Sequence, residues 1–142
     1  MSEKTLWTYL SGLVPRGRYT RIETGETGPG VPDVYYRIFS KKNGWMELKD
    51  SRAPNSPIPF KNEVDGLHAT QLDWIGDEMR MGGLVWIVAR VGRLIYWIHG
   101  SKASQFNGCS DLKSLATYVL NGRFLNDRDT KAIRQMLAGE LL

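Results

Sequence analysis

Asp33, Glu47 and Lys49 have the side chains and the spacing for metal-assisted chemistry. Thirteen residues separate the two carboxylates. Trp45, Glu47 and Lys49 alternate with Met46 and Leu48, which predicts a strand that presents Glu47 and Lys49 on one face. Two carboxylates and an ammonium at one point are costly to bury unless a divalent cation and an anionic substrate complete the charge balance. The set predicts oxygen ligands for Mg²⁺ and a lysine beside an attacking water, as hydrolysis of a phosphodiester requires.

Each of these residues also has a purely structural interpretation. Asp33 follows Pro32 and could be an ordinary turn residue. Glu47 and Lys49 could form a solvated salt bridge on an edge strand. The sequence pattern alone leaves both interpretations open.

The elements that must position these residues follow an α–β–β–β–α–β–β order. Lys41 to Gly44 contains the favoured Asn-Gly pair and predicts a hairpin turn before the Glu47 strand. The proline-containing stretch 50–66 is long for a connector and favours a functional flap. The other predicted elements are a first helix ending before Pro15, strands over 18–23 and 34–39, a helix over 70–81 and strands over 84–89 and 93–99.

Residues 103–142 predict a helical extension of a core that spans residues 1–102. Ser110 opens one predicted helix, which carries Leu112 and Leu115 on a stripe and ends at Asn121-Gly122. Asn126 or Asp127 caps a second helix. The extension is too short to hold its own core, so we expect it to pack on the first 102 residues. It could also supply a dimer contact.

Length and composition indicate one compact domain. The chain has 142 residues, 42% of them hydrophobic, which excludes a disordered tail or a fibrous repeat. Nineteen basic and fifteen acidic residues give a net charge of +4, a mild bias toward polyanions. The single cysteine excludes an intrachain disulfide framework, and the two histidines cannot complete a His–Cys zinc site.

No signal peptide or membrane segment is expected. The sequence begins Met-Ser-Glu-Lys, and its longest apolar run covers only residues 84–89. No G-x-x-x-x-G-K-[ST] phosphate loop occurs, so coupling to ATP is not expected either. These features predict a cytoplasmic protein with no membrane partner.

The ordered set of Pro32-Asp33, Glu47-Leu48-Lys49 and Gln71-Leu72-Asp73-Trp74 resembles the signature of the PD-(D/E)XK nuclease superfamily. Within it, the chain looks like a small stand-alone VRR-NUC domain of the phage type, from about residue 3 to residue 100. The resemblance implies a restriction-endonuclease-like α/β core, with a mixed central sheet flanked by helices. It also implies hydrolysis of DNA that depends on Mg²⁺ or Mn²⁺.

The resemblance assigns roles around the strand. It implies that Asp33, Glu47 and the Leu48 carbonyl hold the metal and that Lys49 orients or deprotonates the attacking water. Gln71 would support the site from a helix that faces the strand, although a solvated glutamine is the competing interpretation.

A third metal-binding carboxylate has two candidates. Related nucleases place a glutamate on the first helix, where Glu3 is the only acidic residue. Glu3 could instead do no more than favour the helix dipole. Glu23, in Arg21-Ile22-Glu23, is the second candidate, and both are expected near the metal.

DNA is the expected partner, held by basic side chains that flank the site and contact phosphates without reading sequence. No base-reading module is recognisable, so structure-selective cleavage is expected. The resemblance to Holliday-junction resolvases implies a homodimer that cuts branched DNA. A nickase, an end-trimming nuclease and a non-catalytic DNA-binding accessory protein are the alternatives. The candidate phosphate contacts are Arg16, Arg18, Arg21, Lys41, Lys42, Arg52 and Lys61.

Overall fold

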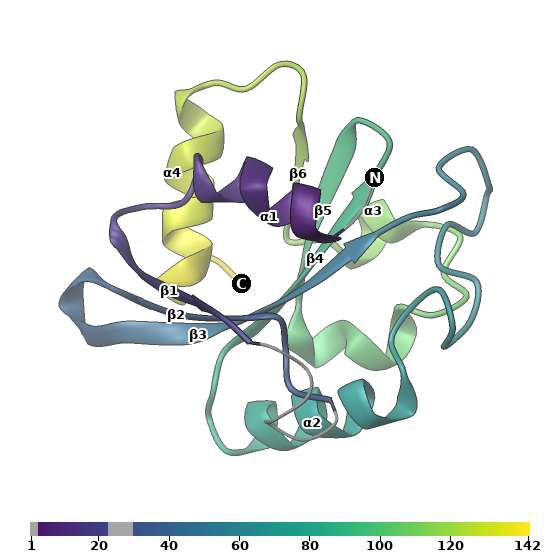
Figure 1. The fold of residues 1–142 in the computed structure, drawn as a ribbon, viewed down its shortest axis with the longest axis horizontal. Coiled ribbons are helices and arrows are strands. Elements are labelled where there is room, and N and C mark those ends of the chain that lie inside the picture. The colour runs from purple at the N-terminus through teal and green to yellow at the C-terminus, as the bar shows by residue number, and fades with distance from the viewer. Residues whose placement is uncertain (1–2, 23–29) are drawn as a thin grey trace.

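A six-stranded mixed sheet with helices on both faces forms the centre of the molecule (Figure 1). The computed structural model describes residues 3–22 and 30–142. The strands lie in sequence order from β1 to β6, and within the sheet only β3 and β4 are parallel neighbours. The chain is therefore an α/β protein, and its first seven helices and strands follow the predicted α–β–β–β–α–β–β order.

The bounds of the elements are as follows. The strands are β1 (Gly17–Arg21), β2 (Val34–Ile38), β3 (Lys42–Asp50), β4 (Val85–Val91), β5 (Leu94–His99) and β6 (Tyr118–Asn121). The α-helices are α1 (Glu3–Ser11), α2 (Ala69–Arg80), α3 (Leu112–Leu115) and α4 (Asp127–Leu137). Two 3₁₀ helices, η1 (Phe39–Lys41) and η2 (Gly100–Gln105), follow β2 and β5.

Two apolar layers enclose the sheet. On one face, side chains of α1 and α4 pack with Met46 and Leu48 of β3. On the other face, α2, η2 and α3 pack over Ile87 and Ala89 of β4. Because β4 lies between both layers, it is buried from Val85 through Arg90, as its near-continuous apolar run predicts.

The parallel pair of β3 and β4 positions the candidate residues. Helix α2 crosses from the end of β3 to the start of β4, on the face where Trp45 contacts Trp74 with ring centroids 5.0 Å apart. Period two then places Glu47 and Lys49 on this same face. The predicted flap is irregular over residues 51–68, but Phe60 and Leu67 anchor it in the core below α2.

The predicted hairpin turn at Asn43-Gly44 is wrong. The chain reverses earlier, through η1, where Lys41 has a φ of 62°. Gly44 lies inside β3 opposite Tyr36, and Asn43 lies opposite Arg37. A Cβ atom at Gly44 would lie 2.5 Å from the Tyr36 hydroxyl and 2.7 Å from the Leu84 carbonyl oxygen. The glycine therefore permits close packing between strands instead of forming a turn.

The purely helical extension predicted for residues 103–142 is also wrong. The first predicted helix is confined to Leu112–Leu115, and the chain then forms β6, which pairs with β5. Leu120 of β6 is buried against the α1 and α4 layer. Pairing with β5 satisfies backbone groups that an edge strand would expose, which outweighs the local helical pattern.

The second helix of the extension agrees with the prediction. Asn126 caps α4 by accepting hydrogen bonds from the Arg128 and Asp129 amides. Ile133, Met136 and Leu137 face the core, as their spacing predicts. No helix in the described ranges is long and apolar enough to cross a bilayer.

Candidate active site at the end of strand β3

Glu47, Lys49 and the half-buried Gln71 form a polar triangle where β3 meets α2. Lys49 Nζ lies 3.6 Å from Glu47 Oε2 and donates a hydrogen bond to Gln71 Oε1 at 3.2 Å. Gln71 Nε2 donates to Glu47 Oε2 at 3.0 Å. Glu47 is 1% exposed and Lys49 is 6% exposed, so this is not the solvated surface pair of the structural interpretation.

The first turn of α2 fixes the orientation of Gln71. The His68 amide, just before the helix, donates to Gln71 Oε1 at 2.9 Å. Because a backbone N–H only donates, this contact identifies the oxygen end of the side-chain amide and leaves Nε2 to face Glu47. A helix-capping contact thus holds Gln71 in the one orientation that serves both Glu47 and Lys49.

Asp33 joins the site through the backbone of β3. The Leu48 amide donates to Asp33 Oδ2 at 2.7 Å, and the Ile22 amide of the neighbouring strand region donates to the Asp33 carbonyl at 2.8 Å. Extending the β2–β3 register beyond its pair of Val34 with Met46 would place Pro32 opposite Leu48. Proline has no N–H to offer the Leu48 carbonyl, so the ladder ends there and the Asp33 side chain takes the Leu48 amide.

The same geometry directs the Leu48 carbonyl toward Asp33. In a strand, the N–H and C=O groups of one residue face the same neighbouring strand. The Leu48 amide faces Asp33, and its carbonyl therefore faces the same side. This is the position in which a backbone oxygen could join two carboxylates around a cation.

Glu47 holds the least satisfied polar atom of the site. Its Oε1 is buried and receives no hydrogen bond within the described part of the chain. Burial raises the pKa of Glu47 well above its ordinary value, and the negative charge of Asp33 raises it further, while Lys49 opposes the change. Burial also raises the pKa of Asp33, against the lowering effect of the Leu48 amide. Two carboxyl groups are thus held together at a cost that a bound cation would remove.

Glu3 lies at the mouth of the site. It lines a pocket of about 160 Å³ together with Lys49. Its negative charge raises the pKa values of both Asp33 and Glu47. Glu23, the competing third carboxylate, lies outside the described residues.

The composition of the site suits a small hard cation. Among the residues that the structure describes, no three His, Cys, Asp or Glu side chains are grouped closely enough to hold a metal by themselves. Mg²⁺, however, is commonly held by one or two carboxylates, with waters and substrate phosphates completing its shell. Asp33, Glu47 and the Leu48 carbonyl fit that kind of site, because the charge of Asp33 acts on the buried Glu47 carboxyl and the Leu48 amide holds Asp33 in place.

Three other polar residues of the pocket were not predicted as site residues from the sequence. Asp50, Asp65 and His68 line it beside Lys49. Asp50 directly follows the Glu-x-Lys motif, a signal that the sequence does contain. Asp65 and His68 reach the site only because the 51–68 segment folds back along β3, which no local pattern encodes.

The predicted DNA contacts fall into two groups. Arg52 lines the pocket with Lys49, and Arg21 ends β1 opposite Val34, next to Asp33. Lys42 begins β3, five residues before Glu47, which is about 17 Å along the strand. The others lie away from the pocket: Lys61 on the 51–68 segment, and Arg16, Arg18 and Lys41 at the same end as Lys42.

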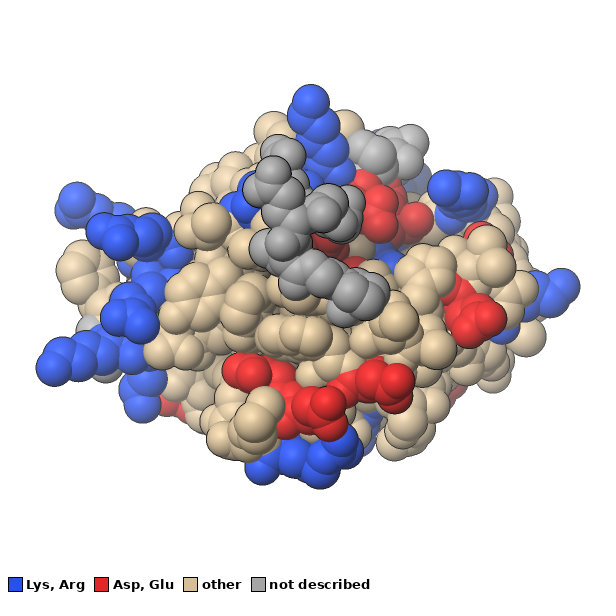
Figure 2. Space-filling view, turned by 60° about the horizontal axis from the view of Figure 1, so that its bottom comes forward, with Lys and Arg blue, Asp and Glu red and all other residues tan. Residues whose placement is uncertain are grey.

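Charge is segregated on the surface. Figure 2 shows Lys and Arg gathered at the end of the molecule that carries the β2–β3 turn, and Asp and Glu gathered over the face of α2. Arg37 belongs to the basic end and was not predicted as a contact. A polyanion that reaches the site would meet repulsion along α2 and attraction at the basic end.

No known family model matches the chain, and no curated protein matches it as a relative.

Proposed function

We propose that the protein is a Mg²⁺-dependent DNA endonuclease that hydrolyses phosphodiester bonds. The observation that carries the proposal is the buried pair of carboxyl groups, because Glu47 interacts with the Asp33 carboxyl as well as with Lys49, whose Nζ lies 3.6 Å from Glu47 Oε2. A structural salt bridge needs one carboxylate for one ammonium, whereas this site holds a second carboxyl, that of Asp33, close to the first. The order of Pro-Asp and Glu-x-Lys along the chain, which resembles that of PD-(D/E)XK nucleases, supports the same reaction.

In this proposal, Asp33, Glu47 and the Leu48 carbonyl are the metal ligands. The bound cation, Mg²⁺ or Mn²⁺, would supply charge neutralisation at the phosphate and a lowered pKa of a coordinated water. Glu3 stands at the pocket mouth, where it could hold a water of the metal shell. The Leu48 amide keeps Asp33 in place by its hydrogen bond.

Lys49 is the proposed catalytic cation. Its ammonium would orient or deprotonate the attacking water and stabilise the negative charge that develops on the phosphate. Gln71 acts as a positioning residue, because it accepts a hydrogen bond from Lys49 and donates one to Glu47. Its own orientation depends on the His68 amide, so α2 holds the lysine at a fixed place.

We propose that the substrate is branched DNA and that the active form is a homodimer. Lys42, at the basic end, lies about 17 Å from Glu47 along β3. A single phosphate therefore could not contact the basic end and the candidate active site at the same time. A junction presents backbones along several directions, and a two-fold dimer would place two sites on related strands. A protein that recognises how the DNA backbones of a junction are arranged would also need no element that reads bases.

The proposal is tested with a panel of four-way junction, flap, nicked, linear and single-stranded DNA, each incubated with the protein in Mg²⁺ and in EDTA. We expect two symmetric cuts in the junction, little cleavage of linear duplex and none in EDTA. Sedimentation should give a dimer. Cleavage that persists in EDTA, or no cleavage of any substrate in Mg²⁺ or Mn²⁺, would contradict the endonuclease assignment. A monomer that cuts linear and branched DNA equally would favour a nickase or end-trimming nuclease.

A further inference from the structure

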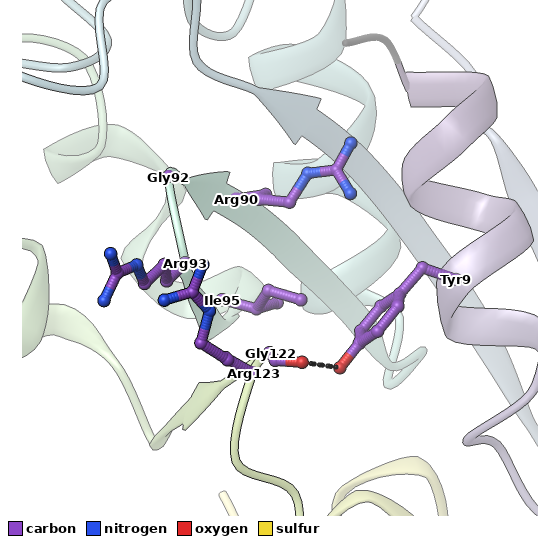
Figure 3. A pocket seen from close by; sticks show the side chains of 7 residues that line it. All are labelled: Tyr9, Arg90, Gly92, Arg93, Ile95, Gly122 and Arg123. Atoms are coloured by element: carbon purple, nitrogen blue, oxygen red, sulfur yellow. Dashed lines mark hydrogen bonds between the residues drawn. The ribbon is translucent and has the colours of Figure 1, made fainter.

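A second pocket, lined by three arginines, lies next to the candidate active site. We call it the arginine pocket. Its volume is about 300 Å³. Figure 3 shows Tyr9 reaching from α1 at one side, with Arg93 and Arg123 at the other side. The lining consists of Tyr9, Arg90, Gly92, Arg93, Ile95, Gly122 and Arg123, and it contains no acidic residue.

Two glycine-arginine pairs build the wall of the arginine pocket. Gly92-Arg93 is the two-residue turn between β4 and β5, and Gly92 has a φ of 61°, which glycine adopts readily. Gly122-Arg123 directly follows β6. The Gly122 amide donates to the Arg93 carbonyl at 2.7 Å, which joins the two turns. Tyr9 Oη donates to the Gly122 carbonyl at 3.0 Å and ties them to α1.

Arg90 differs from the other two arginines of the pocket because it forms an ion pair with Asp50. It donates to both carboxylate oxygens of Asp50, at 3.1 and 2.8 Å, and to the Thr5 hydroxyl at 3.0 Å. Arg93 and Arg123 are exposed at the rim. Asp129 acts electrostatically on Tyr9, but it is buried and already accepts hydrogen bonds from Tyr118 and the Asn126 amide. The rim of the pocket therefore presents two guanidinium groups to an incoming anion.

The arginine pocket and the candidate active site share a wall. Asp50 lines the pocket of Lys49, and its ion-pair partner Arg90 lines the arginine pocket. On α1, Glu3 lines the pocket of Lys49 and Tyr9 lines the arginine pocket, and the two residues are about 9 Å apart along the helix. Along β4, Gly92 lies three residues, or about 10 Å, beyond the residue paired with Lys49.

We infer that the arginine pocket binds a backbone phosphate of a nucleic acid strand whose scissile phosphate lies at Glu47 and Lys49. Measured along the axis of a duplex, a separation of about 10 Å corresponds to a rise of about three nucleotides. Guanidinium groups on two rigid turns suit a phosphate, which they can contact in a bidentate way. The inference rests on the proposed function for the identity of the polyanion. It assigns Arg93 and Arg123 to substrate positioning, a role that the sequence did not suggest for either residue.

The test is DNA binding in EDTA, measured over a salt series. We compare the wild type with Arg93→Ala/Arg123→Ala and with a control, Arg80→Ala/Lys102→Ala, which removes two exposed positive charges from α2 and η2. The first variant should bind all DNA sequences more weakly, and its slope of log K against log salt should be smaller by about two. The control should keep the wild-type slope. Arg93→Lys/Arg123→Lys should restore most of the slope, because the charges return.

Thermal unfolding of each variant verifies that the fold is intact, as expected for exposed side chains. A wild-type slope in Arg93→Ala/Arg123→Ala, or no DNA binding by the wild type, would overturn the inference. Inorganic phosphate that displaces DNA more strongly than sodium chloride does at equal ionic strength would also overturn the inference. The pocket would then be a site for a free anion. The test needs no cleavage, so a reduced slope in a protein that cuts no DNA would support the pocket and reject the proposed reaction.

Discussion

The Asp33 and Glu47 carboxyl groups dominate the energetics of the site at the scale of single residues. Burial raises the pKa of both groups, so the folded metal-free protein retains protons that the unfolded chain has already released. Their contribution to stability is complete in acid, below the ordinary carboxyl range. It is lost as the pH rises through the raised pKa values.

Asp33→Asn should stabilise the metal-free protein at neutral pH. The asparagine oxygen can still accept from the Leu48 amide, and its NH₂ group can donate to Glu47 Oε1, which has no donor in the described residues. Pairing this buried acceptor should raise the free energy of unfolding by about 1–3 kcal/mol. Urea unfolding in EDTA from pH 4 to pH 8 measures the difference, which should shrink toward acid. A variant less stable than the wild type at pH 7 would contradict this account of the carboxyl pair.

Lys49→Met should remove catalysis while leaving the metal site. Methionine keeps most of the volume of the buried stem, and the lost ammonium is the group proposed to act on the developing charge. The single-turnover cleavage rate should fall by about 10²–10³. Mn²⁺ binding, measured by calorimetry, should persist. Simultaneous loss of Mn²⁺ binding would make Lys49 a structural residue.

Some of the residue-level arrangement follows from the sequence and some does not. Alternation along β3 predicts that Glu47 and Lys49 share a face, and their contact at 3.6 Å confirms it. The bridge through Gln71 depends on how α2 crosses from β3 to β4, which is set by tertiary packing. The Leu48 amide contact with Asp33 depends on the end of the β2–β3 ladder, another non-local event.

Strand β3 is the element on which the site depends. Met46 and Leu48 of β3 pack in the layer with α1 and α4, and Trp45 packs against the layer with α2. Glu47, Lys49 and Asp50 lie in the last four residues of the strand. Gly44 lets Tyr36 approach closely enough for the Tyr36 hydroxyl to donate to the Leu137 carbonyl of α4 at 2.7 Å. One glycine therefore sets the fit of β2, β3 and α4.

Gly44→Ala should destabilise the protein by about 1–3 kcal/mol through overpacking, because the new methyl group would meet the Tyr36 hydroxyl and the Leu84 carbonyl. Gly12→Ala is the matched control, since its added Cβ would have only an ordinary contact of 3.6 Å with the Tyr9 carbonyl. Urea unfolding compares the two variants. Equal stability of both would contradict the placement of Gly44 inside a paired strand.

The two errors of element prediction share one cause. Asn43-Gly44 has the local signature of a turn, and residues 110–121 have the local spacing of a helix. In both segments, strand pairing extends over residues that have another local preference, because Asn43 and Gly44 continue the ladder with β2 and residues 118–121 pair with β5. Helix α4, whose cap and apolar stripe are local, was predicted correctly.

At the scale of the whole molecule, charge and shape divide the surface into regions. The basic end at the β2–β3 turn and the acidic face of α2 are separate regions of the surface (Figure 2), and the arginine pocket lies between α1 and the turns after β4 and β6 (Figure 3). A net charge of +4 does not reveal this division. The sequence therefore predicts attraction to a polyanion but not the path that it would take.

The most direct measurement is the single-turnover rate of junction cleavage in Mg²⁺ by Glu47→Gln and by Glu63→Gln. Glutamine preserves the shape of Glu47 but removes the charge that would hold the metal, whereas Glu63 is exposed on the 51–68 segment. We expect Glu47→Gln to abolish cleavage, while its DNA affinity in EDTA stays close to that of the wild type. Glu63→Gln should cleave at the wild-type rate. Cleavage by Glu47→Gln within about tenfold of the wild-type rate, a loss of only about 1.4 kcal/mol in transition-state stabilisation, would contradict the central claim.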